Sequence, residues 1–253
     1  MSVMNAYIVK NPNPLPAGEF SLKFHSRIAP MGRDGADKYI IPSNADILFI
    51  PNKNYDDYRS KEERAVKIGK ITALIILTDV LVNNGRGNEF QVICGNHSQE
   101  LSQLAGEIFD KEGNHKNMAL SEGDEGKFGF EIQALRVTLR VTNCDKLFIQ
   151  EVYLDPQWRG YGIGLLAVRT LIDALPSFTM DLVLMNVGPI AKANHELGCY
   201  PNRSIEESAT SLKKYWARIG FTTVSKDYVE MWTGHYPPRI RAVVPHLLYP
   251  SAS

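Results

Sequence analysis

A glycine-rich loop at residues 155–164, with the sequence DPQWRGYGIG, has the residue types and spacing that most clearly suggest chemistry in this chain. The loop follows an apolar stretch of strand length at 147–154, and it precedes an amphipathic stretch at 163–175 with leucines at helical spacing. The first N–H groups of a helix have no partner within the helix, and they carry the positive end of its dipole. Glycines let the backbone approach a ligand without a Cβ in the way. The pattern of strand, loop and helix therefore predicts an anion site, and phosphate is the anion that such sites commonly hold.

Two common phosphate-binding patterns do not fit this loop. The dinucleotide pattern G-x-G-x-x-G needs a third glycine at position 165, where the chain has Leu165. The P-loop pattern G-x-x-x-x-G-K-S/T occurs nowhere in the sequence. What remains is R-x-x-G-x-G at residues 159–164, between a predicted strand and a predicted helix.

The loop and its surroundings resemble a third kind of site. The segment 151–166, EVYLDPQWRGYGIGLL, resembles the signature motif of the GNAT superfamily of acyl-CoA N-acyltransferases. The resemblance continues through the apolar stretch 181–187 and the predicted helix that ends at Gly220, so that it covers residues 147–234. It implies an α/β fold in which helices flank a mixed, mostly antiparallel central sheet.

The resemblance also implies how acetyl-CoA would bind as co-substrate. Its pyrophosphate would lie on the backbone N–H groups of the loop, and its pantetheine arm would run beside the preceding strand. That strand would diverge from 181–187, so that the thioester lies in the gap and a backbone N–H stabilises the developing oxyanion. The cofactor-binding residues implied in this way are Val152, Tyr153, Leu154, Arg159, Gly160, Tyr161, Gly162, Ile163 and Gly164.

Two residues are candidates for proton transfer. Glu151 lies on the predicted central strand and is the candidate base that takes a proton from the attacking amine; the alternative is an ordinary strand residue or an ion-pair partner. The family's thiolate-protonating tyrosine falls on Trp216 in this chain, and Tyr215 lies one residue earlier, about 100° around a helix. Tyr215 is kept as the candidate acid, and Trp216 is expected to pack against the core or the cofactor arm. The family's asparagine one turn earlier is also absent, because Ala209 falls at about that position.

Residues 188–207 form a long predicted loop, which we assign to acceptor recognition, with the inserted region 83–129 as the other candidate. His195 and Cys199 in this loop have a spacing that a metal could use, but two potential ligands do not make a closed site. We expect no metal, and we interpret the pair as loop residues.

Composition restricts the class of protein. The 253 residues carry 28 Lys+Arg and 28 Asp+Glu, so no general charge favours nucleic acid or an anionic membrane. Three cysteines suggest no disulfide framework, and no apolar stretch reaches the length of a membrane span. We therefore expect a cytoplasmic protein with neither kind of partner.

We expect a single domain of 253 residues. Its predicted parts are an N-terminal strand and irregular region (1–66), an insertion (83–129), an acetyl-CoA-binding core (147–234) and a C-terminal tail (235–253). Periodicity predicts strands at 21–28, 67–82, 130–141, 147–154 and 181–187, and helices at 98–113, 163–175 and 208–220. We also expect a turn at 83–88 and a closing hairpin around 225–227. Residues 30–64 are predicted to be irregular, around an apolar island at 47–50.

The leading hypothesis is an N-acetyltransferase that moves an acetyl group from acetyl-CoA to a primary amine by direct attack in a ternary complex. The acceptor could be a small amine, an amino sugar or a protein amine. The displaced tyrosine motivates an alternative, a catalytically inactive acyl-CoA-binding module. A third possibility is a nucleotide-binding regulator that uses the glycine loop for another phosphate.

Overall fold

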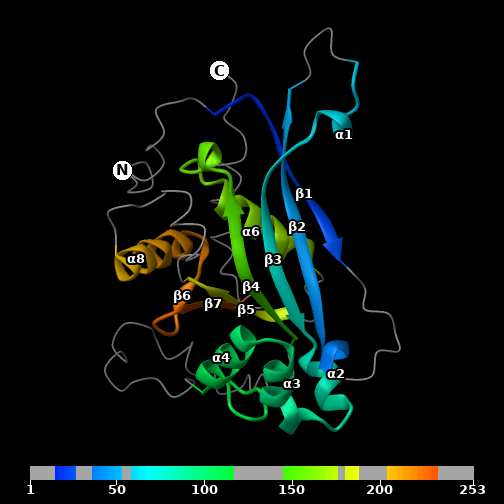
Figure 1. Ribbon diagram of the computed structural model, residues 1–253, viewed down its shortest axis with the longest axis vertical. Coiled ribbons are helices and arrows are strands. Elements are labelled where there is room, and N and C mark those ends of the chain that lie inside the picture. Colours follow the sequence, from blue (N-terminus) through cyan, green and yellow to red (C-terminus); the bar gives the residue numbers. More distant parts are fainter. Residues whose placement is uncertain are drawn as a thin grey trace.

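A seven-stranded sheet organises the protein. The computed structural model describes residues 15–26, 36–52, 58–116, 145–175, 180–187 and 204–232. In these residues the strand order is β1-β2-β3-β4-β5-β7-β6, and all neighbours are antiparallel except β4 and β5, which are parallel (Figure 1). The α/β class and the mixed, mostly antiparallel sheet predicted from the sequence are confirmed. The strands are β1 (Gly18–Ser26), β2 (Ile40–Pro51), β3 (Val66–Ile76), β4 (Asp145–Leu154), β5 (Met180–Asn186), β6 (Thr222–Thr223) and β7 (Tyr228–Trp232).

The described helices connect the strands and cover the sheet. A crossover helix, α6, joins the parallel strands β4 and β5, as parallel pairing requires. Figure 1 shows α2, α3 and α4 grouped at one end of the sheet. None of the described helices is long and apolar enough to cross a membrane. The helices are α1 (Lys61–Arg64), α2 (Thr78–Asn83), α3 (Phe90–His97), α4 (Gln99–Ile108), α6 (Ile163–Ala174) and α8 (Ile205–Trp216), with short 3-10 turns at η2 (Ala36–Tyr39), η3 (Gly87–Glu89), η5 (Pro156–Trp158) and η6 (Ala217–Ile219).

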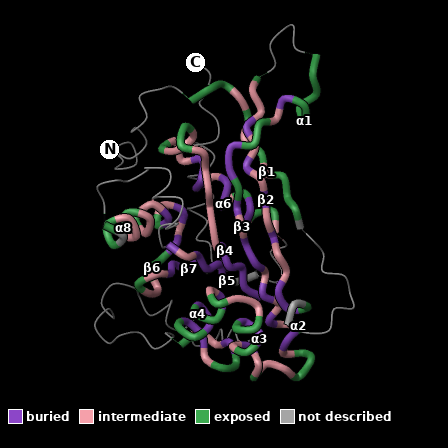
Figure 2. The backbone as a smooth tube through the Cα atoms, in the orientation of Figure 1, coloured by how far each residue is buried: buried purple, intermediate pink, exposed green. Residues whose placement is uncertain are grey.

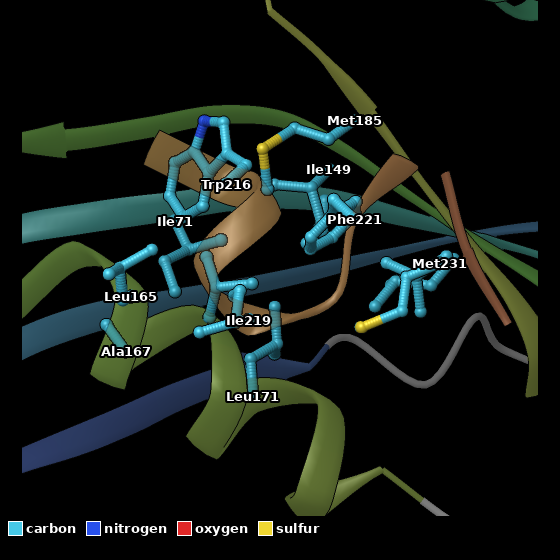
Figure 3. Close-up of a cluster of buried hydrophobic side chains, with 14 of the residues drawn as sticks. Ile71, Ile149, Leu165, Ala167, Leu171, Met185, Trp216, Ile219, Phe221 and Met231 are labelled. Atoms are coloured by element: carbon cyan, nitrogen blue, oxygen red, sulfur yellow. The ribbon is translucent and has the colours of Figure 1, made fainter. Parts of the chain in front are cut away.

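Each face of the sheet has its own hydrophobic core. Successive residues of a strand point to opposite faces, so Leu147 and Ile149 of β4 lie in one core and Phe148 lies in the other. The first core packs the strands against α6 and the end of α8, and Figure 3 shows Trp216 within it. The second core packs the strands against α3 and α4, for example against Leu104. The sheet therefore separates an α6 face from an α4 face.

Two predictions about the first half of the sheet are wrong. Residues 40–51 of the supposedly irregular stretch form the long strand β2, whose alternate residues are buried. The strand was missed because its other face carries polar residues such as Asn44 and Asp46, which made the segment look like a loop. The predicted strand 67–82 ends at Ile76, and its last residues form the short helix α2. A short apolar run does not distinguish a strand from a buried helical turn by its periodicity.

The helical predictions are confirmed in outline. Ser98 caps α4, where its hydroxyl oxygen accepts a hydrogen bond from Leu101 N, but the helix ends at Ile108 and not at 113. Helix α3 was not predicted, although it begins next to the predicted turn. Helix α8 begins at Ile205, three residues before the prediction, because Ser204 and Glu207 form a capping box.

The later strands and the crossover helix agree with the sequence. Helix α6, strand β5 and the hairpin of β6 and β7 lie where the pattern placed them. Strand β4 contains the predicted 147–154, and β1 overlaps the predicted 21–28. The predicted strand 130–141, the tail 235–253, most of the loop 188–207, and with it His195 and Cys199, lie outside the described residues.

Candidate functional site

The pairing of the parallel strands β4 and β5 stops halfway along β4, where β5 ends at Asn186. Strand β4 pairs with β3 from Lys146 to Leu154 but with β5 only over 145–149. The last β5 residue, Asn186, pairs with Tyr228 of β7 and not with β4. In the part of the chain that the structure describes, residues 150–154 of β4 thus have no strand partner on their β5 side. At the same point β4 changes from buried to partly exposed residues (Figure 2).

A β-bulge lies at the point where this pairing stops. Opposite β4, Thr72 faces Glu151 and Ala73 faces Ile149, so Gln150 is the extra residue. Ile149 and Val152 both pack in the core on the α6 face. The two residues between them therefore point to the α4 face, which places two successive polar side chains beside the point where pairing with β5 stops.

The glycine loop joins the end of β4 to α6. Gly160 and Gly162 have φ of 89° and 80°, in the left-handed region that favours glycine. Gly162 is the N-cap of α6, and a Cβ built on it meets no described atom within 4 Å. The backbone conformation, and not crowding by neighbouring side chains, is therefore what requires glycine there, and the space in front of this residue is open among the described residues.

The loop is anchored on both faces of the sheet. Trp158 packs against Phe49 of β2, with ring centroids 4.6 Å apart. Arg159 Nε donates a hydrogen bond to the carbonyl oxygen of Leu154 at 2.8 Å, and its guanidinium lies over the ring of Tyr153 at 5.5 Å. The sequence assigned Arg159 to the cofactor loop, and the structure adds that its side chain fastens this loop to β4.

Most of the other predicted cofactor-binding residues support the loop from the α6 face. Val152, Leu154 and Tyr161 pack against the core there, and Ile163 is buried within it. Gly164 lies close to α8, because a Cβ at this position would be 3.1 Å from the hydroxyl oxygen of Tyr215. The structure thus brings the nine predicted residues together around the end of β4 and the start of α6.

Tyr215 reaches the start of α6 despite its displacement by one position. Its hydroxyl oxygen accepts a hydrogen bond from Leu165 N at 3.3 Å. The first bond between the cap and the helix is from Leu166 N to Gly162 O, so the N–H groups at 163 and 164 have no acceptor within the helix. Trp216 is buried in the core, as expected. Tyr215 therefore belongs to the loop site, next to N–H groups that point out of the helix.

Glu151 is an ion-pair partner in the structure. Its carboxylate lies 2.6 Å from Lys70 Nζ, and its side chain is 24% exposed. This was the alternative role that the sequence left open. An ion pair with a partly exposed lysine contributes little to stability, so the pair leaves room for a second role of the carboxylate.

A second carboxylate on the α4 face was missed by the sequence reasoning. Glu100 of α4 accepts hydrogen bonds from Gln150 Nε2 at 2.8 Å and from Asn186 Nδ2 at 3.2 Å. Burial raises the pKa of the nearby Tyr228 hydroxyl, and the negative charges of Glu107, Glu100 and Asp227 raise it further. No local pattern could have identified Glu100, because its partners are 50 and 86 residues away in the sequence.

Comparisons with known proteins identify neither the chain nor its site: no family model matches it, and no curated protein matches its sequence. Among the described residues, no group of three or more His, Cys, Asp and Glu is arranged to hold a metal ion. What the site can do chemically therefore rests on its own geometry. That geometry combines outward-pointing N–H groups at the start of α6, an edge of β4 that has no strand partner among the described residues, and carboxylates on the opposite face.

Proposed function

We propose that the protein is an N-acetyltransferase, which moves an acetyl group from acetyl-CoA to a primary amine by direct attack in a ternary complex. The observation that carries this proposal is the end of β4–β5 pairing after Ile149, which leaves 150–154 without a described partner on that side, next to a glycine loop that opens α6. The end of this pairing and the loop are two independent features, and the resemblance of the sequence to the GNAT motif implies both. Because both features occur at the same place, they support an acyl-CoA site more than they support a glycine turn that binds no ligand.

The loop supplies the groups that would hold the pyrophosphate. The N–H groups at the start of α6 point out of the helix at the positive end of its dipole, which favours an anion. The edge of β4 at 150–154, which has no strand partner among the described residues, offers backbone groups to which the amide-containing pantetheine arm would pair like a short extra strand. Since Val152 and Leu154 pack against the core, this edge is held rigidly.

The chemistry follows from these positions. The amine nitrogen attacks the thioester carbonyl carbon, and a backbone N–H of this β4 edge stabilises the oxyanion that develops. The tetrahedral intermediate then releases the thiolate, and the acetyl group stays on nitrogen. Tyr215, whose hydroxyl lies at the start of α6, is the candidate that protonates the thiolate. A carboxylate on the α4 face takes the proton that the amine loses.

A second candidate function is an acyl-CoA-binding module without catalysis. It is favoured by two contacts: the Tyr215 hydroxyl is bonded to Leu165 N, and the Glu151 carboxylate is paired with Lys70. Both candidate catalytic groups are thus already engaged within the protein. This alternative keeps the cofactor site but removes turnover.

Two measurements on the purified protein test the proposal. At a CoA concentration of 100 times Kd, binding to the native state adds about 2.7 kcal/mol to the free energy of unfolding, so the melting temperature rises. Thiol release from acetyl-CoA with a panel of amines then separates the enzyme from the inactive module. An unchanged melting temperature at saturating CoA contradicts both candidates, whereas stabilisation by CoA without thiol release for any amine supports the module alone.

A further inference from the structure

The carboxylate of Glu100 is held between the parallel strands β4 and β5. Its Oε2 accepts from Gln150 Nε2, and its Oε1 accepts from Asn186 Nδ2. Gln150 is the bulged residue of β4, and Asn186 is the last residue of β5. Each oxygen is therefore tied to one of these two strands, and the carboxylate lies beside the place where their pairing stops.

The charge of this carboxylate is not neutralised by the groups that hold it. Both donors are neutral side-chain amides. Within the described residues no lysine, arginine or histidine forms a salt bridge with Glu100, whereas Glu151 on the same face has Lys70 at 2.6 Å. An ionised carboxylate has about four acceptor positions, and two hydrogen bonds leave others for a ligand. A cation is the ligand that this arrangement favours.

We infer that Glu100 receives the acceptor amine as an ammonium ion and takes its proton before the attack, so that the acceptors are alkylamines that are positively charged at neutral pH. This inference rests on the proposed acetyl transfer. An alkylammonium must lose a proton before its nitrogen has a lone pair, since its pKa is about 10. The fixed carboxylate of Glu100, which has no cationic partner among the described residues, meets both requirements, because it attracts the cation and accepts the proton.

The protons and bonds of the reaction balance with Glu100, Tyr215 and water. One ammonium proton passes to a Glu100 oxygen, and the nitrogen lone pair forms a bond to the thioester carbonyl carbon. As the tetrahedral intermediate collapses, the C–S bond breaks, the thiolate takes the hydroxyl proton of Tyr215, and the second proton that the nitrogen loses replaces it by way of water. The products are the amide, the thiol and protonated Glu100, which returns its proton to water. Gln150 and Asn186 act as positioning residues, because they touch the carboxylate and not the reacting atoms.

The test compares two acceptor amines in four proteins. n-Butylamine is a cation at pH 7 and aniline is neutral, so only the first needs the carboxylate. The proteins are the parent, Glu100→Gln, Glu151→Gln and Glu107→Gln, where the last removes an exposed carboxylate from the same helix. Glu100→Gln keeps the shape of the side chain. Calorimetric binding of acetyl-CoA reports whether each variant is folded with an intact cofactor site.

We expect Glu100→Gln to bind acetyl-CoA like the parent but to lose at least about 100-fold in kcat/KM for n-butylamine at pH 7, the usual minimum for a lost general base. With aniline, kcat/KM of the variant falls by less than about tenfold. With n-butylamine, the difference in kcat/KM between variant and parent decreases as the pH approaches the amine pKa of about 10. Glu107→Gln behaves like the parent with both amines.

Two results overturn the inference: one rejects only the role of Glu100, and the other also rejects the proposed acetyl transfer. If Glu100→Gln keeps its activity with n-butylamine and Glu151→Gln loses it, the base is Glu151 and the proposed transfer stands. If the parent binds acetyl-CoA but releases no thiol with either amine or with the wider panel, the proposed transfer itself fails, and the role of Glu100 fails with it.

Discussion

Replacing Gly162 by alanine gives a quantitative test of the cofactor loop. The residue has φ of 80° and ψ of 4°, a left-handed conformation that costs an L-residue about 1–2 kcal/mol. A Cβ here contacts no described atom within 4 Å, so no steric term adds to this cost. For a domain of this size the loss corresponds to a melting temperature lower by about 2–8 °C.

The effect on CoA binding is separate from this loss of stability. The new Cβ enters the open space in front of α6, or the backbone relaxes away from positive φ and reorients the N–H groups at 163 and 164. Either change removes part of the proposed phosphate site. We expect the Kd for CoA to rise at least tenfold, which is about 1.4 kcal/mol. Pantetheine, which lacks the pyrophosphate, should bind the variant and the parent with similar affinity.

Gly85 provides a matched control for the backbone cost. It has φ of 72°, and a Cβ built on it also meets no described atom within 4 Å. It follows α2 in a turn outside the candidate site. Gly85→Ala should therefore lower the melting temperature by a similar amount and leave the Kd for CoA unchanged. If calorimetry gives Gly162→Ala the same CoA affinity as Gly85→Ala and the parent, the loop is a turn without a phosphate, and the reasoning about α6 is refuted.

Three further predictions concern contacts outside the cofactor itself. Tyr215→Phe removes the hydroxyl that accepts from Leu165 N, and urea unfolding should show a loss of about 1 kcal/mol; an unchanged midpoint would show that this hydrogen bond is not formed in solution. Burial raises the pKa of Asp145 above its ordinary value, because the charged carboxylate is less stable in the folded protein than in water. Below the pKa of the unfolded state Asp145 is protonated in both states and does not oppose folding. As the pH rises through the folded-state pKa, the carboxylate becomes charged and the protein loses stability. Asp145→Asn should therefore be more stable than the parent at pH 7 and equal to it at pH 3, and a pH-independent difference would contradict this. Burial raises the pKa of the Cys94 thiol to about 12, so iodoacetamide at pH 8 should label Cys94 only after unfolding, as peptide mass spectrometry can check.

The loop site could be predicted because its signals are local. The glycines, the preceding strand and the leucines of the following helix lie within about thirty residues, and the structure places these elements where the pattern put them. The start of α4 was predicted correctly for the same reason, because Ser98, a common N-cap residue, directly precedes the helical pattern. The Ser204 capping box was equally readable and was missed, so the start of α8 was predicted too late.

The carboxylate side of the candidate site could not be predicted, because long-range packing creates it. Glu100 meets Gln150 and Asn186 only when α4 packs on the sheet. The bulge at Gln150 depends on the register between β3 and β4, which no local pattern specifies. The Glu151–Lys70 pair likewise joins two strands that are distant in sequence. Residue types alone therefore indicated one carboxylate on the central strand, whereas the fold presents two in different electrostatic surroundings.

The topology of the sheet explains why a reaction would take place beyond Ile149. Helix α6, with its positive end, lies on one face, and Glu100 of α4 lies on the other. A polyanionic cofactor and a cationic amine would therefore be attracted to opposite faces of the same sheet. Where the sheet is continuous, its paired strands separate the two faces. Strands β4 and β5 are the only parallel neighbours among the described strands, and they pair only over 145–149. Beyond this point β4 has no described partner on its β5 side and leads into the start of α6, and open sheets of parallel strands commonly bind ligands at the carboxyl ends of their strands. The edge of β4 without a described partner is thus where the two proposed reactants would meet.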